Sequence, residues 1–594
     1  MPCRVACCME KASGSAAEQV PTDWRKVALV SAGVAAAAGL GYVAYRHFTK
    51  KEGASSDDKP HSKVAPKVAV VHPEQAKVDP SSQKSAAGAV TANEFKEKGN
   101  QLFKQARYQD AIECYTKAIE LSTVRDRIAA STYHQNRAAA YDKLHKPDKV
   151  VADCTAAIEY NQTYAKAYNR RAKANEALGC YGEALKDLTA VCVLEQFNNM
   201  NTLNEADRVL KIVAENKAKE MVQARGALAS VPLSITFVES YLSSFCEDPI
   251  MNSLPPSAVM NGPAGDSQDL VSSFETATRH LALKEYEQVQ KACQDEIDAD
   301  APMALEALLL RATFALIQGN SKLASDDFNE FFARFNSLDD DQQRVKIKLK
   351  VNAYIKRGSF HMQQGRKEEA LSDFKQAEIT DPQNADVYHH RGQLLILMNE
   401  VQEAKQDFNK CVELRPDFAV ARVQSSYADY RYALKGTSTL DVHKSIEKFE
   451  RVVDSFPGCA EGYALLGQVY AERSAFDDAA KMFDKAIELQ PQNANIYVHK
   501  GLLELQKTED IDGAKQIMLS AIQVDPHCEF AYETLGTIEV QRGNINEAIE
   551  YFDRALHLAR TELELTHIYG MREAAMAQRW AAQQLGFELP TVGR

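Results

Sequence analysis

The chain has 594 residues, a formal net charge of −12 at pH 7 and 45% hydrophobic residues. This acidic balance argues against nucleic acid as a partner, because nucleic-acid-binding domains carry a cationic excess. The 12 cysteines are scattered without metal-ligand spacing, which is typical of a reducing compartment. Since no phosphate-binding loop, dinucleotide fingerprint or catalytic nucleophile motif occurs, we expect no enzyme, no cofactor and no metal site.

A membrane anchor is predicted near the amino terminus. Residues 27–45 carry no charge and would form a helix about 28 Å long, close to the ~30 Å hydrocarbon core of a bilayer. The segment starts too late and runs too long for a cleaved secretory signal, so an uncleaved single-pass anchor is favoured over a cleaved or soluble segment. More cations follow the segment than precede it, which places residues 1–26 across the membrane and the rest of the chain in the cytosol.

Residues 46–91 are predicted to be a disordered basic tether. They are rich in Ser, Lys, Pro and Ala and contain almost no large apolar side chain. Such a segment cannot bury enough surface to offset the entropy lost on ordering.

Beyond the tether, the chain repeats a pattern of small residues, an aromatic residue and a proline. The order after Gly467 is Ala479, Phe483, Ala486 and Pro491. Equivalent glycines recur about every 34 residues, which is the period of tetratricopeptide repeats. The small residues allow two helices to approach, the aromatic residue fills the gap between neighbours, and the proline ends the second helix. The pattern therefore predicts an all-α superhelical solenoid.

About eleven repeats fall into two arrays. A short array of three repeats covers 92–198, and a long array of eight repeats with a final capping helix at 562–585 covers 270–585. The repeats near 270–303, 305–338 and 419–459 depart from the pattern, and the last of these carries an insertion around 435–439. Residues 199–269 are predicted to be a linker, helical at first and then a Pro- and Gly-containing loop.

Five polar residues of the short array fall on the first helices of their repeats, which line the concave face. They are Lys96, Asn100, Asn136, Lys166 and Arg170. Two amides and three cations in one groove suit a peptide with a free terminal carboxylate and an acidic side chain. Any one of them could be an ordinary solvated residue, but their coincidence across three repeats favours a site. The neighbouring Arg137 and Arg171 are interpreted as ordinary surface charges.

The concave face of the long array is predicted to mix acidic, amide and apolar side chains. This mixture suits an amphipathic, partly basic peptide or a hydrophobic client segment. The alternative is that these residues bind nothing and simply pack against neighbours or face water. The candidate lining residues are Glu461, Gln468, Glu472, Asn495, Val498, Leu502, Phe530, Glu533 and Thr537.

The five polar positions resemble the dicarboxylate clamp of chaperone-adaptor tetratricopeptide domains, with all five residue types present. That resemblance implies binding of the Glu-Glu-Val-Asp tails of cytosolic seventy- and ninety-kilodalton heat-shock chaperones. The whole organisation resembles the large chaperone-docking import receptor of the mitochondrial outer-membrane translocase, the animal-type seventy-kilodalton receptor family. The local sequences of residues 460–465, 497–503 and 531–544 resemble the same family.

The second resemblance implies a single-pass protein of the mitochondrial outer membrane with its repeats facing the cytosol and residues 1–26 in the intermembrane space. Such a receptor accepts precursors without a cleavable presequence, above all inner-membrane carriers, and passes them to the translocation pore. Two alternatives stay open: a clamp-type co-chaperone or adaptor anchored in another membrane, and a soluble co-chaperone scaffold.

Overall fold

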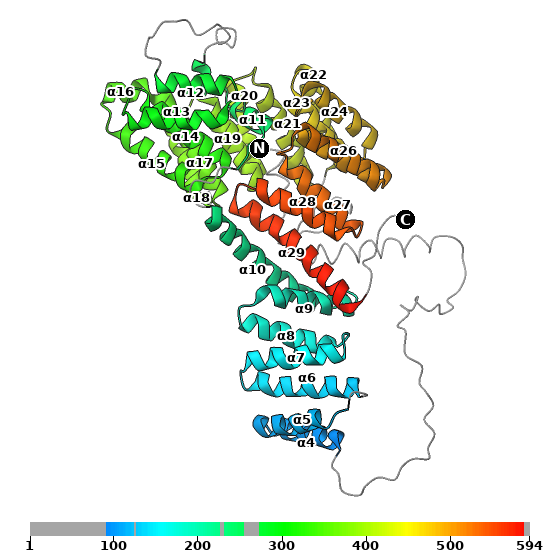
Figure 1. The fold of residues 1–594 in the computed structure, drawn as a ribbon. Helices are drawn as coiled ribbons and strands as arrows, with labels where there is room; N and C mark the ends of the chain where they lie inside the picture. The colour runs from blue at the N-terminus through cyan, green and yellow to red at the C-terminus, as the bar shows by residue number, and fades with distance from the viewer. Residues whose placement is uncertain (1–90, 124–125, 226–230, 255–271, 437, 587–594) are drawn as a thin grey trace, which may run out of the picture. The chain divides into compact units, whose positions relative to one another are not determined.

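The computed structural model describes residues 91–123, 126–225, 231–254, 272–436 and 438–586. Over these residues the chain forms 26 α-helices and one short 3-10 helix, with no strand (Figure 1). None of these helices is long and apolar enough to span a bilayer. The predicted tail, anchor and tether, and with them residues 27–45, lie outside the described part of the chain.

The described residues divide into two compact units. The short-array unit comprises residues up to Ile212 together with those from Met576 onward, and the long-array unit runs from Val213 to Ala575. Two long helices, α10 (Met200–Arg225) and α29 (Glu562–Leu585), contribute residues to both units. The sequence predicted the bounds of α29, but its last turns belong to the short-array unit rather than to the stack that it was expected to cap.

The short-array unit stacks three antiparallel helix pairs, as predicted (Figure 1). The pairs are α4 (Ala92–Lys104) with α5 (Tyr108–Glu120), α6 (Arg127–Lys143) with α7 (Pro147–Tyr160), and α8 (Ala165–Ala177) with α9 (Tyr181–Leu194). The first helices α4, α6 and α8 are neighbours in the stack and form its inner layer.

The long-array unit contains eight helix pairs, so the described residues hold the eleven repeats that the sequence predicted. The pairs are α12 (Ser273–Ala282) with α13 (Tyr286–Asp298), α14 (Ala304–Gln318) with α15 (Ser321–Asn336), α17 (Ile347–Gln363) with α18 (Lys367–Thr380), α19 (Ala385–Leu397) with α20 (Val401–Leu414), α21 (Ala419–Lys435) with α22 (Thr439–Ser455), α23 (Ala460–Glu472) with α24 (Phe476–Leu489), α25 (Ala494–Thr508) with α26 (Ile511–Val524), and α27 (Glu529–Gln541) with α28 (Ile545–Leu558). The insertion near 435–439 lengthens both helices of its pair, since α21 and α22 each have 17 residues.

Close packing within each repeat explains the recurrent glycine and aromatic residue. At Gly392 an added Cβ atom would lie 2.9 Å from the ring of Phe408 in the second helix of the same repeat, which is too close for a real contact. The same arrangement joins Gly99 to Tyr115, Gly358 to Phe374, Gly467 to Phe483 and Gly536 to Phe552. The aromatic ring therefore packs on the glycine of its own repeat, and not only in the gap between neighbouring repeats.

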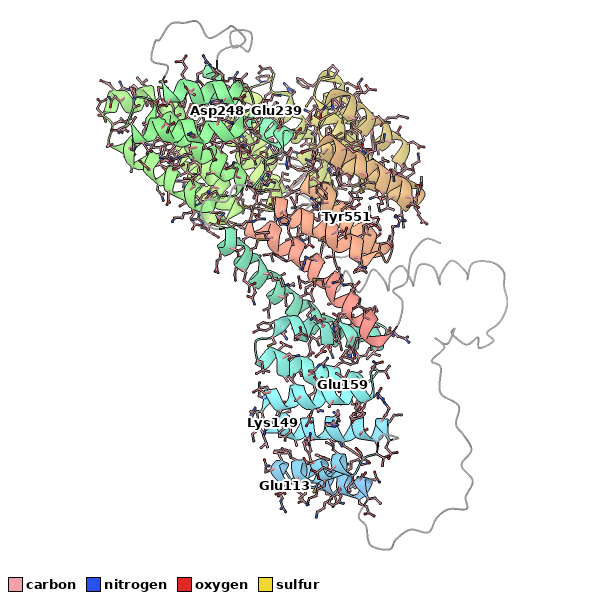
Figure 2. All side chains as sticks on the ribbon, in the orientation of Figure 1. Glu113, Lys149, Glu159, Glu239, Asp248 and Tyr551 are labelled. Atoms are coloured by element: carbon pink, nitrogen blue, oxygen red, sulfur yellow. The ribbon has the colours of Figure 1, made fainter. Side chains whose placement is uncertain are left out.

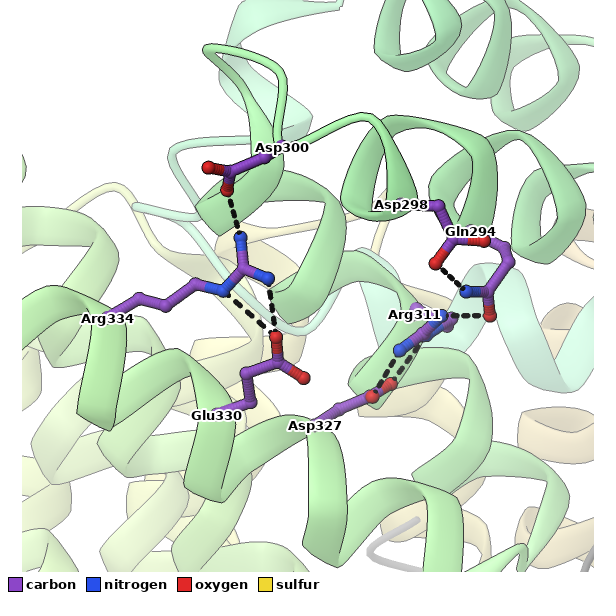
Figure 3. Close-up of polar contacts among 7 residues, drawn as sticks. All are labelled: Gln294, Asp298, Asp300, Arg311, Asp327, Glu330 and Arg334. Carbon is purple, nitrogen blue, oxygen red and sulfur yellow. Dashed lines mark hydrogen bonds and ion pairs between the residues drawn. The ribbon is translucent and has the colours of Figure 1, made fainter.

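A partly buried ion pair also recurs within the repeats and corrects the interpretation of Arg137 and Arg171. An arginine of the first helix contacts an aspartate 16 residues later in the second helix, through both carboxylate oxygens. The pairs are Arg137–Asp153, Arg171–Asp187, Arg311–Asp327, Arg357–Asp373 and Arg391–Asp407. Figure 3 shows the Arg311–Asp327 pair, in which the arginine also donates to Gln294. These arginines are structural links between helices, not free surface charges.

The second half of the linker forms part of the core of the long-array unit. It contains α11 (Ile235–Leu242) and the 3-10 helix Met251–Ser253, and its Phe245 and Ile250 join the apolar core of the first four repeats. The Asp386 carboxylate on α19 accepts hydrogen bonds from the backbone amides of Cys246 and Glu247, each at 2.8 Å. Residues 235–254 are thus an integral part of the array, whereas the Pro- and Gly-containing stretch from 255 onward, on which the loop prediction was based, lies outside the described residues.

Candidate functional site

The five polar residues of the short-array unit lie on its inner helices. Two are on α4, one is on α6, and Lys166 and Arg170 are on α8. Lys166 is exposed and makes no hydrogen bond or ion pair with the described residues, while the other four are half-buried. The structure brings Asn100 and Asn136 into direct contact, because the Asn136 amide donates to Asn100 Oδ1 at 3.2 Å. Arg170 donates from Nη1 to the backbone carbonyl of Gln135 at 3.2 Å, which places its guanidinium on the neighbouring repeat.

The side-chain amide of Asn100 has a fixed orientation. Its oxygen accepts from the Tyr115 hydroxyl at 2.8 Å and from Asn136 Nδ2 at 3.2 Å. With the oxygen occupied twice, the Asn100 NH2 group faces Glu97 Oε2 at 3.3 Å. Burial raises the pKa of Tyr115 to about 12, so that its hydroxyl remains a donor at neutral pH. The arrangement presents Asn100 as a hydrogen-bond donor to an anion.

The carboxylate of Glu97 binds both hydrogen-bond donors of the site on α4, Lys96 and Asn100. The Lys96 ammonium lies 2.9 Å from Glu97 Oε1, while Asn100 contacts Oε2 of the same carboxylate. The hydrogen bond from Lys96, followed by that from Asn100, lowers the pKa of Glu97 below its usual value. Lys96 and Asn100 therefore hold one carboxylate together, that of Glu97.

Three residues of this site were not predicted from the sequence: Glu97, Tyr115 and Gln135. Tyr115 carries a signal, since it stands 16 residues after Gly99, at the aromatic position of the repeat. Glu97 and Gln135 carry none, because their roles depend on which neighbour their side chain or carbonyl meets. The neighbouring Arg137 does not add to the site, because its guanidinium is bound to Asp153 and Thr116.

The candidate residues of the long groove lie on α23, α25 and α27, and most of them contact a neighbouring repeat. The structure joins Glu461 to Gln424 at 2.7 Å, Gln468 to His499 at 3.4 Å, Glu472 to Tyr430 at 2.8 Å, Glu533 to His567 at 3.0 Å, and Asn495 to Cys528 at 3.5 Å. The ring of Phe530 lies 5.5 Å from that of His499. The inner helices therefore carry a row of polar contacts that bridge one repeat to the next.

The remaining three candidates of the long groove differ in their surroundings. Leu502 is half-buried between two apolar clusters, and the Thr537 hydroxyl donates to the backbone carbonyl of Glu533 at 3.0 Å. Val498 is fully buried against Ala494 and Ala521. Its inclusion among the lining residues was therefore wrong, because a side chain packed into the core of its own repeat cannot reach a client. No group of residues suited to a metal ion occurs in the described part of the chain.

Comparisons with known proteins agree on the repeats and on the family. The tetratricopeptide repeat models match residues 351–384, 385–418, 440–494 and 531–569. Mitochondrial import receptor subunit TOM70 of Homo sapiens is 40% identical over 585 residues, which cover 96% of this chain and 94% of that protein. The protein of the same name from Mus musculus is 41% identical over 506 residues, which cover 84% of this chain and 81% of that protein. The crystal structure of yeast Tom70 aligns with a TM-score of 0.45 and 24% identity, over 82% of this chain and 96% of that one.

Proposed function

The chain belongs to the TOM70 family of mitochondrial import receptors, and on that premise we propose that its short-array unit docks cytosolic heat-shock chaperones. The ligand is the Glu-Glu-Val-Asp tail of the seventy- and ninety-kilodalton chaperones. Lys96, Asn100 and Asn136 surround the terminal carboxylate. Lys166 and Arg170 reach the aspartate side chain and the nearby backbone.

One observation carries this proposal: Lys96 and Asn100 already share a carboxylate. Their contacts to Glu97 measure 2.9 and 3.3 Å, which are hydrogen-bonding distances for a carboxylate ligand. The Asn100 amide is held in its donor orientation before any ligand arrives, so little entropy is lost on binding. Hydrogen bonds to charged groups contribute about 1.5–3 kcal/mol each, and two anionic groups in one fixed relation distinguish a chain end from an internal acidic stretch.

The long-array unit receives the client in this proposal. Its clients are hydrophobic precursors with internal signals, above all inner-membrane carriers, which pass on to the pore of the outer-membrane translocase. The row of polar contacts between repeats, with Leu502 and Phe530 beside it, supports a groove for an amphipathic segment. Holding the chaperone on the same chain raises the effective concentration of its client near this groove.

The clamp is tested with Arg170→Ala. Loss of a charge-assisted contact weakens the affinity for the tail roughly 10- to 100-fold. Fluorescence anisotropy with a labelled Glu-Glu-Val-Asp peptide measures the affinity, and direct client binding stays largely intact. Arg107→Ala is the matched control, because Arg107 is an exposed arginine of the same unit that pairs with Asp110. Unchanged affinity in Arg170→Ala contradicts the proposal.

The membrane in which the protein is anchored is tested separately. We propose that residues 27–45 anchor the protein in the mitochondrial outer membrane with both arrays in the cytosol. A fluorescent protein fused after residue 70 should then label mitochondria, and the full chain should stay in the membrane pellet after carbonate extraction. Labelling of another membrane favours the alternative of an adaptor anchored elsewhere. Release by carbonate favours a soluble scaffold.

A further inference from the structure

The short-array unit contains a cavity that the clamp residues do not line. It lies between α7, α8, α9 and the end of α29, has a volume of about 300 Å³, and includes Glu159, Arg171, Asn175, Glu183, Trp580 and Gln584 in its lining. Asn175 follows Lys166 by nine residues on α8, so that the two point about half a turn apart. The cavity and the clamp therefore occupy different faces of the same helix.

The indole of Trp580 forms a rigid wall of this cavity. Its ring meets that of Tyr168 edge to face, with the centroids 6.4 Å apart and an interplanar angle of 86°. Trp580 also packs on the apolar cluster that includes Ala157, Ala167 and Ala581. Trp580 also lines the cavity, so its indole is within reach of a ligand there.

A buried amide in the cavity lacks a partner. Asn175 is only 6% exposed and lines the cavity, yet its side chain makes no hydrogen bond with the described residues. Arg171 beside it makes its hydrogen bonds elsewhere, because it donates to both oxygens of Asp187 at 2.9 and 2.7 Å and to Thr155 at 3.0 Å. The free amide faces the cavity, where it can bind a ligand that carries a hydrogen-bonding group.

The charge of the cavity favours a cation. Asp187 neutralises Arg171, and Lys186 lies 2.7 Å from Glu183. Glu159 remains: its carboxylate makes no ion pair with the described residues, and Figure 2 shows it on α7. A carboxylate, a free carboxamide and an indole face together suit a planar cation with several donors.

We propose that this cavity binds an arginine side chain presented by a peptide segment of a partner protein. The guanidinium lies over the Trp580 indole and donates to the Glu159 carboxylate and the Asn175 carboxamide oxygen. Arginine fits better than lysine, because its planar fork carries five donors and stacks on aromatic rings. The site is independent of the proposed chaperone clamp, with which it shares no residue.

Tryptophan fluorescence tests the site directly. The sequence has two tryptophans, so that Trp24→Phe in the full-length chain leaves Trp580 as the sole reporter. The probe is acetyl-Gly-Arg-Gly-amide, and its citrulline counterpart keeps the shape but not the charge. We expect a saturable change in emission with half-saturation of the order of millimolar for the arginine peptide only, as befits a ligand with one anchoring side chain.

Variants in the same background separate the site from nonspecific attraction. Glu159→Gln should raise the half-saturating concentration at least about fivefold, because a charge-assisted hydrogen bond is lost. Glu113→Gln is the matched control, since Glu113 is an exposed carboxylate on α5 (Figure 2). Asn175→Ala should weaken binding as well, and its melting curve shows whether this variant stays folded. If Asn175→Ala unfolds, Glu159→Gln still tests the site, because Glu159 is exposed and its replacement does not disturb the core.

Three results would overturn the proposal. The first is a response that rises linearly with the arginine peptide, and the second is an equal response to the citrulline peptide. The third is an equal affinity of the Glu159→Gln and Glu113→Gln variants. An equal response to a lysine peptide would overturn the choice of a guanidinium.

Discussion

The hydroxyl of Tyr115 is expected to tune the affinity of the clamp without touching its ligand. It donates to Asn100 Oδ1 at 2.8 Å, and this contact helps to turn the Asn100 NH2 group toward the carboxylate. In Tyr115→Phe the ring remains against Gly99, so the helix packing is kept. The Asn100 amide keeps only Asn136 as an orienting donor and can rotate its oxygen toward the ligand.

The size of this effect follows from one hydrogen bond between neutral groups. Such a bond contributes about 0.5–1.5 kcal/mol, which corresponds to a two- to tenfold loss of affinity if all of it is felt at the ligand. Asn136 Nδ2 still donates to Asn100 at 3.2 Å, so we expect the lower part of this range. Tyr115→Phe should therefore weaken tail binding clearly less than Arg170→Ala, which removes a charge.

Fluorescence anisotropy with a labelled Glu-Glu-Val-Asp peptide measures this change in the full-length chain. Tyr133→Phe is the matched control, because Tyr133 is also a buried tyrosine of the short array, and its hydroxyl has no hydrogen-bond partner among the described residues. Melting curves of both variants check the fold. If Tyr115→Phe binds the tail as tightly as Tyr133→Phe does, the Asn100 amide is not oriented by Tyr115 and the reasoning is refuted.

Three further outcomes are expected. Glu97→Gln should tighten tail binding in the same anisotropy assay, because a neutral amide competes less well than a carboxylate for Lys96; weaker binding would contradict this competition. Lys356→Met should expose residues 241–254 to hydrogen exchange, because it leaves the buried carboxylate of Asp248, 2.7 Å from the lysine, without its partner. Breaking such a pair costs about 3–5 kcal/mol, which corresponds to a loss of protection of roughly 100-fold or more. Unchanged protection would refute this prediction. In the unmodified chain, burial by itself raises the pKa of Asp248, but the Lys356 ammonium and the backbone amides of Met251 and Ile250 outweigh burial and lower it. The stabilisation by Asp248 is therefore complete above its unfolded pKa of about 3.9 and lost as the pH falls through the lower folded value, so protection of residues 241–254 should persist at pH 5 and decline only below about pH 4.

The linear chain determined the repeats and thereby the helices. The 34-residue period, the glycine–aromatic spacing and the prolines are local signals, because each repeat is one helix pair whose packing is set within its own sequence. The same periodicity placed Lys96, Asn100, Asn136, Lys166 and Arg170 on inner helices, since register along a helix fixes its face.

Only the folded molecule decided how these side chains are partnered. From the sequence, Arg137 and Arg171 were interpreted as surface charges, yet each is bound to an aspartate of the facing helix. Val498 was predicted to line the groove, although close helix packing buries it. Knowing on which face of a helix a residue lies does not distinguish a groove-lining residue from a core residue, because neighbouring helices approach this closely.

The sequence by itself determined that helix pairs recur, how often they recur, and that the five polar residues of the short array lie on first helices. The tertiary structure alone decided that residues 235–254 pack into the core of the long-array unit and that Glu97 pairs with Lys96. It also decided that Trp580 lines the same cavity as Asn175. The reason is distance along the chain: Trp580 meets residues more than 400 positions away, and no local pattern encodes a contact between segments so far apart.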